Sequence, residues 1–183
     1  MYPTNSLVLE IYNLSKAYKG VQALNHVHLT GKQHSAFVFL GPNGAGKTTT
    51  MRLLLGPIRP KSGCGTVLAQ DIFRDSIAIR SRVGHLPQQP RIADDMSARE
   101  TPHFRARCCF KGREADIGKR AAEILALVGL INKADQPIKG CSGGERQRLG
   151  IAHSHVNYPD LPVLDEPAAS LDPIGPWQFR HEA

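Results

Sequence analysis

Short apolar runs between turn-forming residues are the first pattern along the chain. Such runs predict β-strands, because a strand that is buried on both faces needs only a few consecutive apolar residues. The second run leads directly into a glycine-rich segment, and the third follows a loop that is rich in proline and glycine. The predicted strands cover residues 7–11, 36–40, 66–69 and 161–165.

Helical periodicity marks the segments between these strands. Met51, Leu54 and Leu55 fall on one face, and they predict a helix that stops at residues 56–57, which are glycine and proline. A longer apolar stripe predicts a second, amphipathic helix that ends near Gly129. The stripe comprises Ile117, Ala121, Ile124, Leu125 and Val128.

A further helix is expected to begin at Ser142, because Ser142-Gly143-Gly144-Glu145 has the spacing of a capping box. Strands that are separated by helical segments of this length predict a mainly parallel sheet with right-handed crossovers. Pro162 lies inside the last predicted strand, and a proline cannot donate a ladder hydrogen bond, which argues against a central place for that strand. The predicted fold class is α/β with a helical insertion.

The composition fits one soluble globular domain. The chain has 183 residues, of which 41% are hydrophobic and 21% charged. Apolar runs such as Ala36 to Leu40 are far shorter than the about 20 residues that cross a bilayer, and no secretory signal is visible at the N-terminus. The net charge of +7 comes from interspersed charges of both signs, so we expect no nucleic-acid-binding tail. The four cysteines lack metal-ligand spacing and are expected to be free thiols in a reducing cytoplasm.

The glycine-rich segment matches the pattern G-x-x-x-x-G-K-[ST] in full, between a predicted strand and a predicted helix. Glycines permit a tight turn whose backbone N–H groups point at phosphate oxygens, and the helix N-terminus adds partial positive charge. Lys47 is expected to reach the β- and γ-phosphates of a nucleotide, and Thr48 to bind Mg²⁺. The alternative is a glycine-rich turn that precedes Lys-Thr by chance. The expected binding residues are Gly41, Pro42, Asn43, Gly44, Ala45, Gly46, Lys47, Thr48 and Thr49.

An acidic pair, Asp165-Glu166, ends the last predicted strand. Asp165 is expected to hold the water shell of Mg²⁺, and Glu166 to act as the general base that polarises the attacking water. An ordinary acidic turn after a strand has the same appearance. The presence of the phosphate loop in the same chain favours the catalytic interpretation.

With these motifs in place, the chain resembles the nucleotide-binding domain of ABC transporters. Residues 141–147, Cys-Ser-Gly-Gly-Glu-Arg-Gln, are similar to the family signature, whose usual form is Leu-Ser-Gly-Gly-Gln. Cys141 therefore stands in place of leucine and Glu145 in place of glutamine. Residues 84–88 resemble the Q-loop of the family, and residues 169–172 resemble its D-loop.

The resemblance implies roles for residues outside the phosphate loop. Tyr18 would stack on adenine, and Gln88 would contact Mg²⁺ and sense the γ-phosphate. Residues 142–144 would bind ATP that is held by a second nucleotide-binding domain, with Asp172 at that interface. A half-buried core tyrosine and a plain helix cap are the simpler interpretations of Tyr18 and Ser142. The expected catalytic residues are Lys47, Gln88 and Glu166, and the expected metal-binding residues are Thr48, Gln88 and Asp165. The further nucleotide-binding residues are Tyr18, Gln88, Ser142, Gly143, Gly144 and Asp172.

The resemblance also implies a domain organisation. Residues 1–183 would form one domain of the P-loop NTPase fold, with an antiparallel β subdomain at its N-terminus. The nucleotide-binding core would cover residues 1–89 and 146–183, and a helical subdomain that ends in the signature would cover residues 90–145. Family domains continue past the D-loop with a helix and a strand that finishes at a switch histidine. We therefore expect this chain to be truncated, with the C-terminal part of the core missing, and we assign that role to no residue.

The implied function is that of an ATP-binding subunit of an ABC transporter, which hydrolyses ATP if the domain is complete or complemented. ATP and Mg²⁺ would be its cofactors. ATP-dependent dimerisation with a second nucleotide-binding domain would drive transport through a membrane-spanning subunit on a separate chain, so the protein would lie at the cytoplasmic face of the membrane. Residues 51–56 and 171–175 resemble bacterial exporter ATPases of the multidrug or ABC-2 type.

Two other functions remain open at this stage. A soluble ABC-type ATPase could act on nucleic acid or ribosomes through a cluster of basic residues. Such clusters are usually solvated helical faces, and neither a coiled-coil nor a zinc insertion separates the phosphate loop from the signature, so nucleic acid is an unlikely partner. A nucleotide-binding remnant that does not hydrolyse ATP is the other alternative. The basic cluster comprises Arg105, Arg107, Lys111, Arg113, Lys119 and Arg120.

Overall fold

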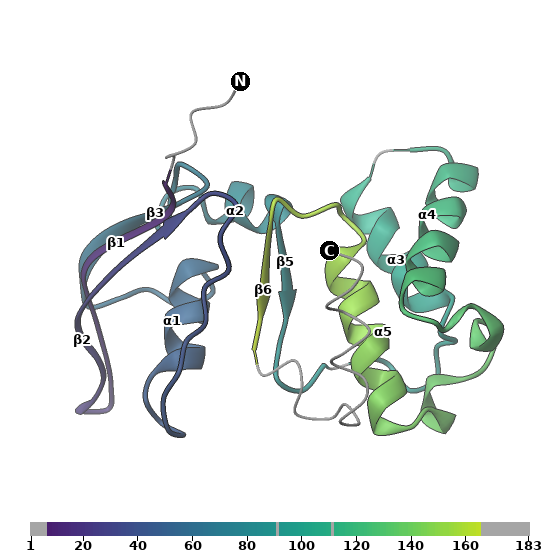
Figure 1. Ribbon diagram of the computed structural model, residues 1–183, viewed down its shortest axis with the longest axis horizontal. Helices are drawn as coiled ribbons and strands as arrows, with labels where there is room; N and C mark the ends of the chain where they lie inside the picture. Colours follow the sequence, from purple (N-terminus) through teal and green to yellow (C-terminus); the bar gives the residue numbers. More distant parts are fainter. Residues whose placement is uncertain (1–6, 91, 111, 166–183) are drawn as a thin grey trace. The chain divides into compact units, whose positions relative to one another are not determined.

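The computed structural model describes residues 7–90, 92–110 and 112–165, and the chain divides into two compact units between Ser81 and Arg82. The first unit holds a four-stranded antiparallel sheet, and the second holds a two-stranded parallel sheet with helices (Figure 1). The predicted α/β class, with an antiparallel part at the N-terminus and a parallel sheet, is confirmed. The predicted division into a core and a helical subdomain stays a prediction.

The first unit is built on a long β-hairpin. Strand β1 (Leu7–Tyr18) pairs antiparallel with β2 (Val21–Lys32), so the strand expected at residues 7–11 is the beginning of a longer one. Lys19 and Gly20 connect the two strands with φ angles of 44° and 86°. Positive φ at both central residues is what a two-residue type I′ turn requires, and this turn matches the right-handed twist of the strands.

Two further strands complete this sheet. Strand β1 pairs on its other edge with β3 (Ser62–Val67), and β3 pairs with β4 (Gln70–Asp71). All neighbours are antiparallel, in the order β2-β1-β3-β4. The side chains of Ile11 and Leu14 of β1 are fully buried. The sheet therefore has one apolar face on which a helix can pack.

The strand predicted at residues 66–69 is wrong in its position, because strand β3 spans residues 62–67. Leu68 and Ala69 have φ angles of 52° and 62° and form the turn that follows. The loop rich in proline and glycine was expected to cover residues 57–66, but Gly63 lies in the strand. A Cβ at Gly63 would be 2.4 Å from the backbone oxygen of Asn13, so this glycine permits the close approach of β3 to β1.

The strand predicted at residues 36–40 is also wrong. This segment has neither helix nor strand, and its large apolar side chains Phe37, Val38 and Leu40 are 48%, 74% and 88% exposed. A strand is stable only when a neighbour satisfies its backbone N–H and C=O groups. No strand in the described ranges pairs with residues 36–40, so the apolar run remains without regular structure.

The first unit contains helix α1 (Lys47–Leu54) and all but the last residue of helix α2 (Ser76–Arg82). Helix α1 follows the phosphate motif, as predicted, and buries Met51 and Leu54. Helix α2 is shorter and buries Ile79. The side chain of Arg80 donates a hydrogen bond of 3.0 Å to the backbone oxygen of Leu55, which satisfies a carbonyl at the C-terminal end of α1.

The sheet of the second unit consists of β5 (Val83–Leu86) and β6 (Leu161–Leu164), which pair in parallel. Pro162 lies in β6 opposite Gly84. Within the described part of the chain, β6 has β5 as its one partner strand, and an edge position of this kind accommodates a proline. The backbone N–H of Asp165 donates a 2.9 Å hydrogen bond to the carbonyl of Leu86, which carries the pairing one residue past the strand.

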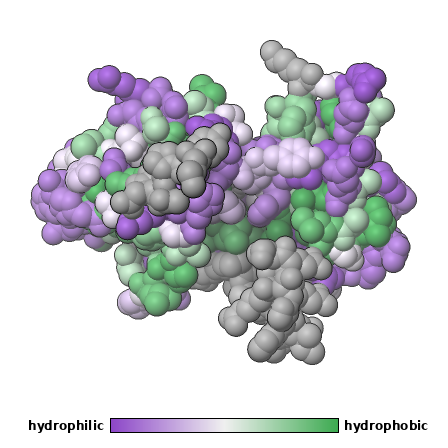
Figure 2. Space-filling model, turned by 45° about the horizontal axis from the view of Figure 1, so that its top comes forward, coloured by the Kyte–Doolittle hydropathy of each residue, from purple (hydrophilic) through white to green (hydrophobic). Residues whose placement is uncertain are grey.

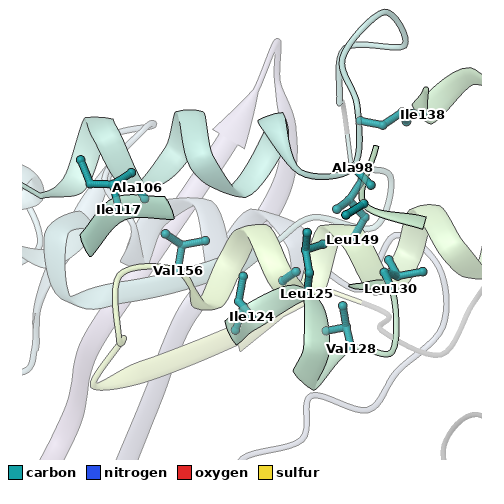
Figure 3. Packing of buried hydrophobic residues seen from close by; sticks show 12 residues of the cluster. Ala98, Ala106, Ile117, Ile124, Leu125, Val128, Leu130, Ile138, Leu149 and Val156 are labelled. Atoms are coloured by element: carbon teal, nitrogen blue, oxygen red, sulfur yellow. The ribbon is translucent and has the colours of Figure 1, made fainter. Parts of the chain in front are cut away.

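Three helices and two short 3₁₀ turns surround an apolar cluster in this unit. The helices are α3 (Glu100–Cys109), α4 (Glu114–Leu127) and α5 (Gly143–His155), and the turns are η1 (Ile131–Lys133) and η2 (Ile138–Gly140). The cluster, seen in Figure 3, joins all three helices. Its members are Ala98, Ala106, Ile117, Ile124, Leu125, Val128, Leu130, Ala134, Ile138, Leu149, Ala152 and Val156.

The predicted amphipathic helix is confirmed as α4, and it ends at the expected residue. The N–H of Gly129 donates to the carbonyl of Ala126, and that of Leu130 donates to the carbonyl of Leu125. Gly129 has φ 67°, so these bonds form a Schellman motif. Leu130, the last residue of this motif, is buried, and η1 begins at the next residue.

A largely buried histidine, His153, lies on helix α5. Burial, together with the positive charge of Arg105, lowers the pKa of His153 to about 4. Its Nδ1 atom is buried and has no hydrogen-bond partner in the described structure. An unfolded histidine binds a proton near pH 6.5, so the unfolded chain takes up a proton as the pH falls towards 4 while the folded chain does not. Acidification through this range therefore destabilises the fold.

We expect His153 to reduce the free energy of unfolding by about 2 kcal/mol between about pH 7 and about pH 5. In the variant His153→Gln this part of the pH dependence should disappear, because glutamine does not titrate. His28→Gln, at an exposed position of β2, should leave it unchanged. Urea unfolding at a series of pH values measures the effect. The same acid loss in the wild type and in His153→Gln would contradict it.

Candidate nucleotide-binding site

The predicted phosphate-binding residues form a tight loop in the first unit, immediately before helix α1. Gly44 and Gly46 both have φ 85°, a backbone conformation that residues with a Cβ rarely adopt. A Cβ at Gly46 would also lie 2.6 Å from a side-chain carbon of Leu24 and 2.7 Å from the backbone oxygen of Ala23. The loop is closed by a 3.2 Å hydrogen bond from the N–H of Ala45 to the carbonyl of Pro42. The glycines are therefore required by geometry at these two positions.

Lys47 is the first residue of helix α1, and its side chain folds back over the loop. Its Nζ donates hydrogen bonds to the carbonyl oxygens of Gly41, at 2.6 Å, and of Pro42, at 3.2 Å. An ammonium group in this place puts a positive charge at the mouth of the loop, next to the backbone N–H groups of the helix N-terminus. The arrangement is suited to a polyphosphate, because a positive charge and the N–H donors of a helix N-terminus occur at the same loop.

The threonines that follow Lys47 lie in the first turn of helix α1. Thr48 and Thr49 are partly exposed, whereas Thr50 is buried and donates from its hydroxyl to the carbonyl of Gly46 at 3.0 Å. Thr48 is thus the hydroxyl beside the lysine that the motif assigns to Mg²⁺. Thr50 has a structural role, because its hydroxyl bonds to the glycine that precedes the helix.

Tyr18, the predicted adenine-stacking residue, ends strand β1. Its ring is 42% exposed, so it is not a core tyrosine. The Nζ of Lys16 lies 5.1 Å from the ring centroid, and the same ammonium donates to the backbone oxygen of Arg59 at 2.6 Å. The ammonium lies over one face of the ring, so a base would stack on the opposite face.

Gln88 and Asp165, two further predicted site residues, lie in the second unit. Gln88 follows strand β5 and is exposed. Asp165 follows strand β6, and its side chain is buried, at 4% exposure, next to the backbone bond to Leu86. Because β5 and β6 are parallel, both residues come after the carboxyl ends of adjacent strands. This edge is where ligand-binding residues gather in α/β proteins.

The signature segment forms the N-terminus of helix α5, and the predicted capping box is confirmed. The backbone N–H of Glu145 donates to Ser142 Oγ at 3.3 Å, and the N–H of Ser142 donates to Glu145 Oε2 at 2.8 Å. Gly143 and Gly144 are the intervening residues, and an α-helix offers no internal acceptor to N–H groups in its first turn. A Cβ at Gly143 would meet no described atom within 4 Å, so a close approach of the described chain is not what requires a glycine here.

The predicted site residues fall into groups that belong to different units. Tyr18 and the phosphate loop lie in the first, and Gln88, Asp165 and the signature lie in the second. Within the second unit, a salt bridge of 2.6 Å between Arg146 and Asp94 connects the signature helix to the segment that follows Gln88. Glu166 and Asp172 lie outside the described residues.

Sequence reasoning missed two lysines that contact predicted site residues. Lys16 precedes Tyr18 by two residues in β1, but the pairing register with β2 shifts between Lys16 and Ala17, so simple strand alternation does not identify this contact. Lys133 forms an ion pair with Glu145 of the signature. No local sequence pattern indicates this pair, since the two residues are brought together only by the path of the chain after helix α4.

Within the described residues, four members of the predicted basic cluster are paired with acidic side chains, and Lys111 lies outside those residues. Arg113 pairs with Asp116 at 3.0 Å, and Lys119 and Arg120 both lie within 4.0 Å of Glu123. Arg107 lies 3.7 Å from Glu114. The guanidinium of Arg120 also donates to two backbone carbonyls at the end of α5. A face neutralised in this way offers little free positive charge to nucleic acid.

The outer surface is mixed in character. On the face shown in Figure 2, hydrophobic residues form separate patches between hydrophilic ones. Among the residues that the structure describes, no helix has both the length and the apolar character that are needed to cross a membrane.

A glycine-rich phosphate loop, an adjoining antiparallel sheet and a second unit with a capped signature helix define a nucleotide-binding domain of the P-loop class. The family model described as ABC transporter matches residues 24–169, and the chain belongs to this family. The chain is 36% identical over 175 residues to the bacitracin transport ATP-binding protein BcrA of Bacillus licheniformis. It is 37% identical over 179 residues to the Nod factor export ATP-binding protein I of Cupriavidus pinatubonensis. These matches cover 96% and 98% of this chain but 56% and 54% of the relatives, so the chain spans about half their length.

Solved structures of the same fold agree with this assignment. A dimeric, post-hydrolysis structure of the ATP-binding cassette MJ0796 bound to ADP and Pi superposes with a TM-score of 0.86 at 24% identity, covering 93% of this chain and 79% of the other. The structure of cbiO1 from Clostridium perfringens, part of the ABC transporter complex cbiONQ, has a TM-score of 0.82 at 28% identity and covers 94% and 70%. The predicted P-loop NTPase fold is thus confirmed.

Proposed function

We propose that this chain binds ATP and acts as the ATP-hydrolysing part of an ABC transporter subunit. The observation that carries the proposal is the loop of residues 41–48, where two glycines at φ 85° and the ammonium of Lys47 surround the N-terminus of helix α1. This arrangement supplies both the N–H donors and the charge that a triphosphate requires. Membership of the family supports ATP as the nucleotide.

Mg²⁺ is the metal that we propose for this site. Thr48, Gln88 and Asp165 offer a hydroxyl, an amide and a carboxylate oxygen, which is the hard donor set that Mg²⁺ prefers. Asp165 fits the role because it directly follows strand β6, at the carboxyl end of a parallel strand pair, where ligand-binding residues gather in α/β proteins. When bound, the metal would neutralise charge on the β- and γ-phosphate oxygens. Glu166 would accept a proton from the attacking water as general base.

We further propose that the chain works at the cytoplasmic face of a membrane with two partners. The relatives include transport and export ATP-binding proteins, and one structural neighbour is a dimer. A second nucleotide-binding domain would place its ATP against the N-terminus of the signature helix, at the N–H groups of Gly143 and Gly144. A membrane-spanning subunit on another chain would provide the path for an exported substrate. The pairing of the basic cluster gives no support to a nucleic acid partner.

The metal assignment predicts a defined effect of Asp165→Asn. We expect this variant to need about tenfold more Mg²⁺ for half of the ATP-dependent thermal stabilisation, because an amide oxygen carries no charge to hold the cation. The matched control is Asp160→Asn, since Asp160 lies before the opposite end of strand β6 and pairs with Arg82 on the surface. Magnesium titrations at fixed ATP provide the measurement.

Equal magnesium requirements for the wild type and Asp165→Asn would contradict the proposed metal site. The absence of any ATP-dependent thermal shift in the wild type would contradict the proposed function itself. Binding of MgATP without turnover, also in the presence of a complete partner domain, would select the non-hydrolysing remnant over the ATPase.

A further inference from the structure

The carboxylate of Glu145 lies at the N-terminus of the signature helix, in the capping box formed with Ser142. Its Oε2 accepts the backbone N–H of Ser142 at 2.8 Å, and its side chain is only 12% exposed. The hydrogen bonds of the capping box use the N–H groups of Ser142 and Glu145 themselves. The N–H groups of Gly143 and Gly144 take no part in the capping box, and an α-helix offers no internal acceptor to N–H groups in its first turn.

A negative charge in this position has two opposite effects. It stabilises the helix, because a carboxylate near the N-terminus interacts favourably with the helix dipole. It also repels any phosphate that approaches the N–H groups of Gly143 and Gly144, because like charges a few ångströms apart interact strongly where water is partly excluded. An uncompensated Glu145 would thus favour the helix and oppose the ligand.

Lys133 supplies the compensating charge. Its Nζ pairs with Glu145 Oε1, and this contact, with the bond from Ser142, lowers the pKa of Glu145 to about 2. The adjacent cation, Arg146, is engaged elsewhere, in its 2.6 Å salt bridge with Asp94. Among the described residues, Lys133 is the cation that the structure pairs with Glu145.

The fold holds Lys133 in this position through its backbone. The Schellman motif at Gly129 ends helix α4, and buried Leu130 fixes the start of η1. The N–H of Lys133 donates to the carbonyl of Leu130 at 3.0 Å, and the carbonyl of Lys133 accepts from the N–H of Gln136 at 3.0 Å. The lysine therefore extends from a fixed turn, although about half of its side chain is exposed, at 49%.

We infer that Lys133 is a positioning residue for the signature: it cancels the charge of Glu145 and holds that carboxylate in the capping box, so that Gly143 and Gly144 can receive a phosphate. The inference rests on the proposed function, in which that phosphate belongs to ATP on a second nucleotide-binding domain, and it takes a second copy of this chain as that domain. It assigns to Lys133 an effect that exists only while residue 145 is negatively charged. Removing the charge of Glu145 should therefore make Lys133 dispensable.

The test is a double-mutant cycle with Lys133→Met, Glu145→Gln and the double variant. We expect Lys133→Met to raise the MgATP concentration for half-maximal self-association about fivefold to tenfold, since it leaves a largely buried carboxylate unpaired beside the phosphate. Glu145→Gln and the double variant should both stay within about twofold of the wild type, because glutamine keeps the capping box without the charge. Lys139→Met, which removes an exposed lysine of η2, is the matched control.

Sedimentation measures self-association across an ATP titration, and the thermal shift with ATP measures binding to the phosphate loop, which all variants should retain. A normal ATP response of Lys133→Met overturns the inference, and so does a defect that persists in the double variant, since this would indicate a purely structural role. A wild type that binds ATP without self-association overturns the proposed dimerisation together with the inference. A wild type without any ATP-dependent thermal shift overturns the proposed function.

Discussion

Replacement of Lys47 by alanine is expected to weaken ATP binding by about 100-fold or more, equivalent to about 3 kcal/mol. The ammonium group is placed between the carbonyls of Gly41 and Pro42, at the mouth of the loop. Charge-assisted hydrogen bonds to phosphate are about twice as strong as neutral ones, and the alanine variant loses them all. The ATP-dependent thermal shift should vanish at nucleotide concentrations that saturate the wild type. Isothermal calorimetry gives the affinity directly.

Two comparisons make this result specific. Lys32→Ala removes an exposed lysine at the end of strand β2 and should leave the affinity unchanged. Lys47→Arg keeps the charge but changes the shape of the head group, so it should recover only part of the binding. An unaltered ATP-dependent shift in Lys47→Ala would show that the loop does not hold the triphosphate in the proposed way.

Replacement of Leu125 by alanine is expected to lower the free energy of unfolding by about 2–5 kcal/mol. Leu125 is fully buried in the cluster seen in Figure 3, to which Leu149 of the signature helix also belongs. The substitution removes apolar contacts and leaves a cavity that the surrounding helices can fill only in part. Urea unfolding, followed by circular dichroism, measures the loss.

Leu127→Ala is the matched control, because it makes the same chemical change two residues further along the same helix. Leu127 is 61% exposed, so its truncation should change stability by no more than about 0.5 kcal/mol. Similar losses for both variants would contradict the packing of helix α4 against α5. In that case the apolar stripe would have another partner.

The helices could be predicted because their signals are local. The stripe from Ile117 to Val128 has the period of a helix, and Gly129 can adopt the positive φ that ends it. The capping box at Ser142 is similarly complete within four residues. These features depend on neighbours in the sequence, so the sequence contains all the information that they need.

The strands were predicted less well because a strand depends on a partner that is distant in the sequence. The apolar run at residues 36–40 lacks such a partner in the described structure and forms no strand. Strand β3 includes Gly63, a residue that the sequence places in a loop. Because glycine has no side chain, the backbone of β3 can approach Asn13 of β1 closely. Neither outcome can be derived from the composition of the segment itself.

By itself, the sequence determined the phosphate loop, the signature and the family, because these motifs encode short-range backbone geometry. Only the tertiary structure decided which strands pair and which charges meet. Lys133 and Glu145 show the difference most clearly. They are 12 residues apart in the sequence, and the 3₁₀ turn η1 and the N-terminus of helix α5 bring their side chains into contact. The physical reason is that a side-chain contact of this kind depends on the packed path of the chain, whereas a turn or a cap depends on the residues that form it.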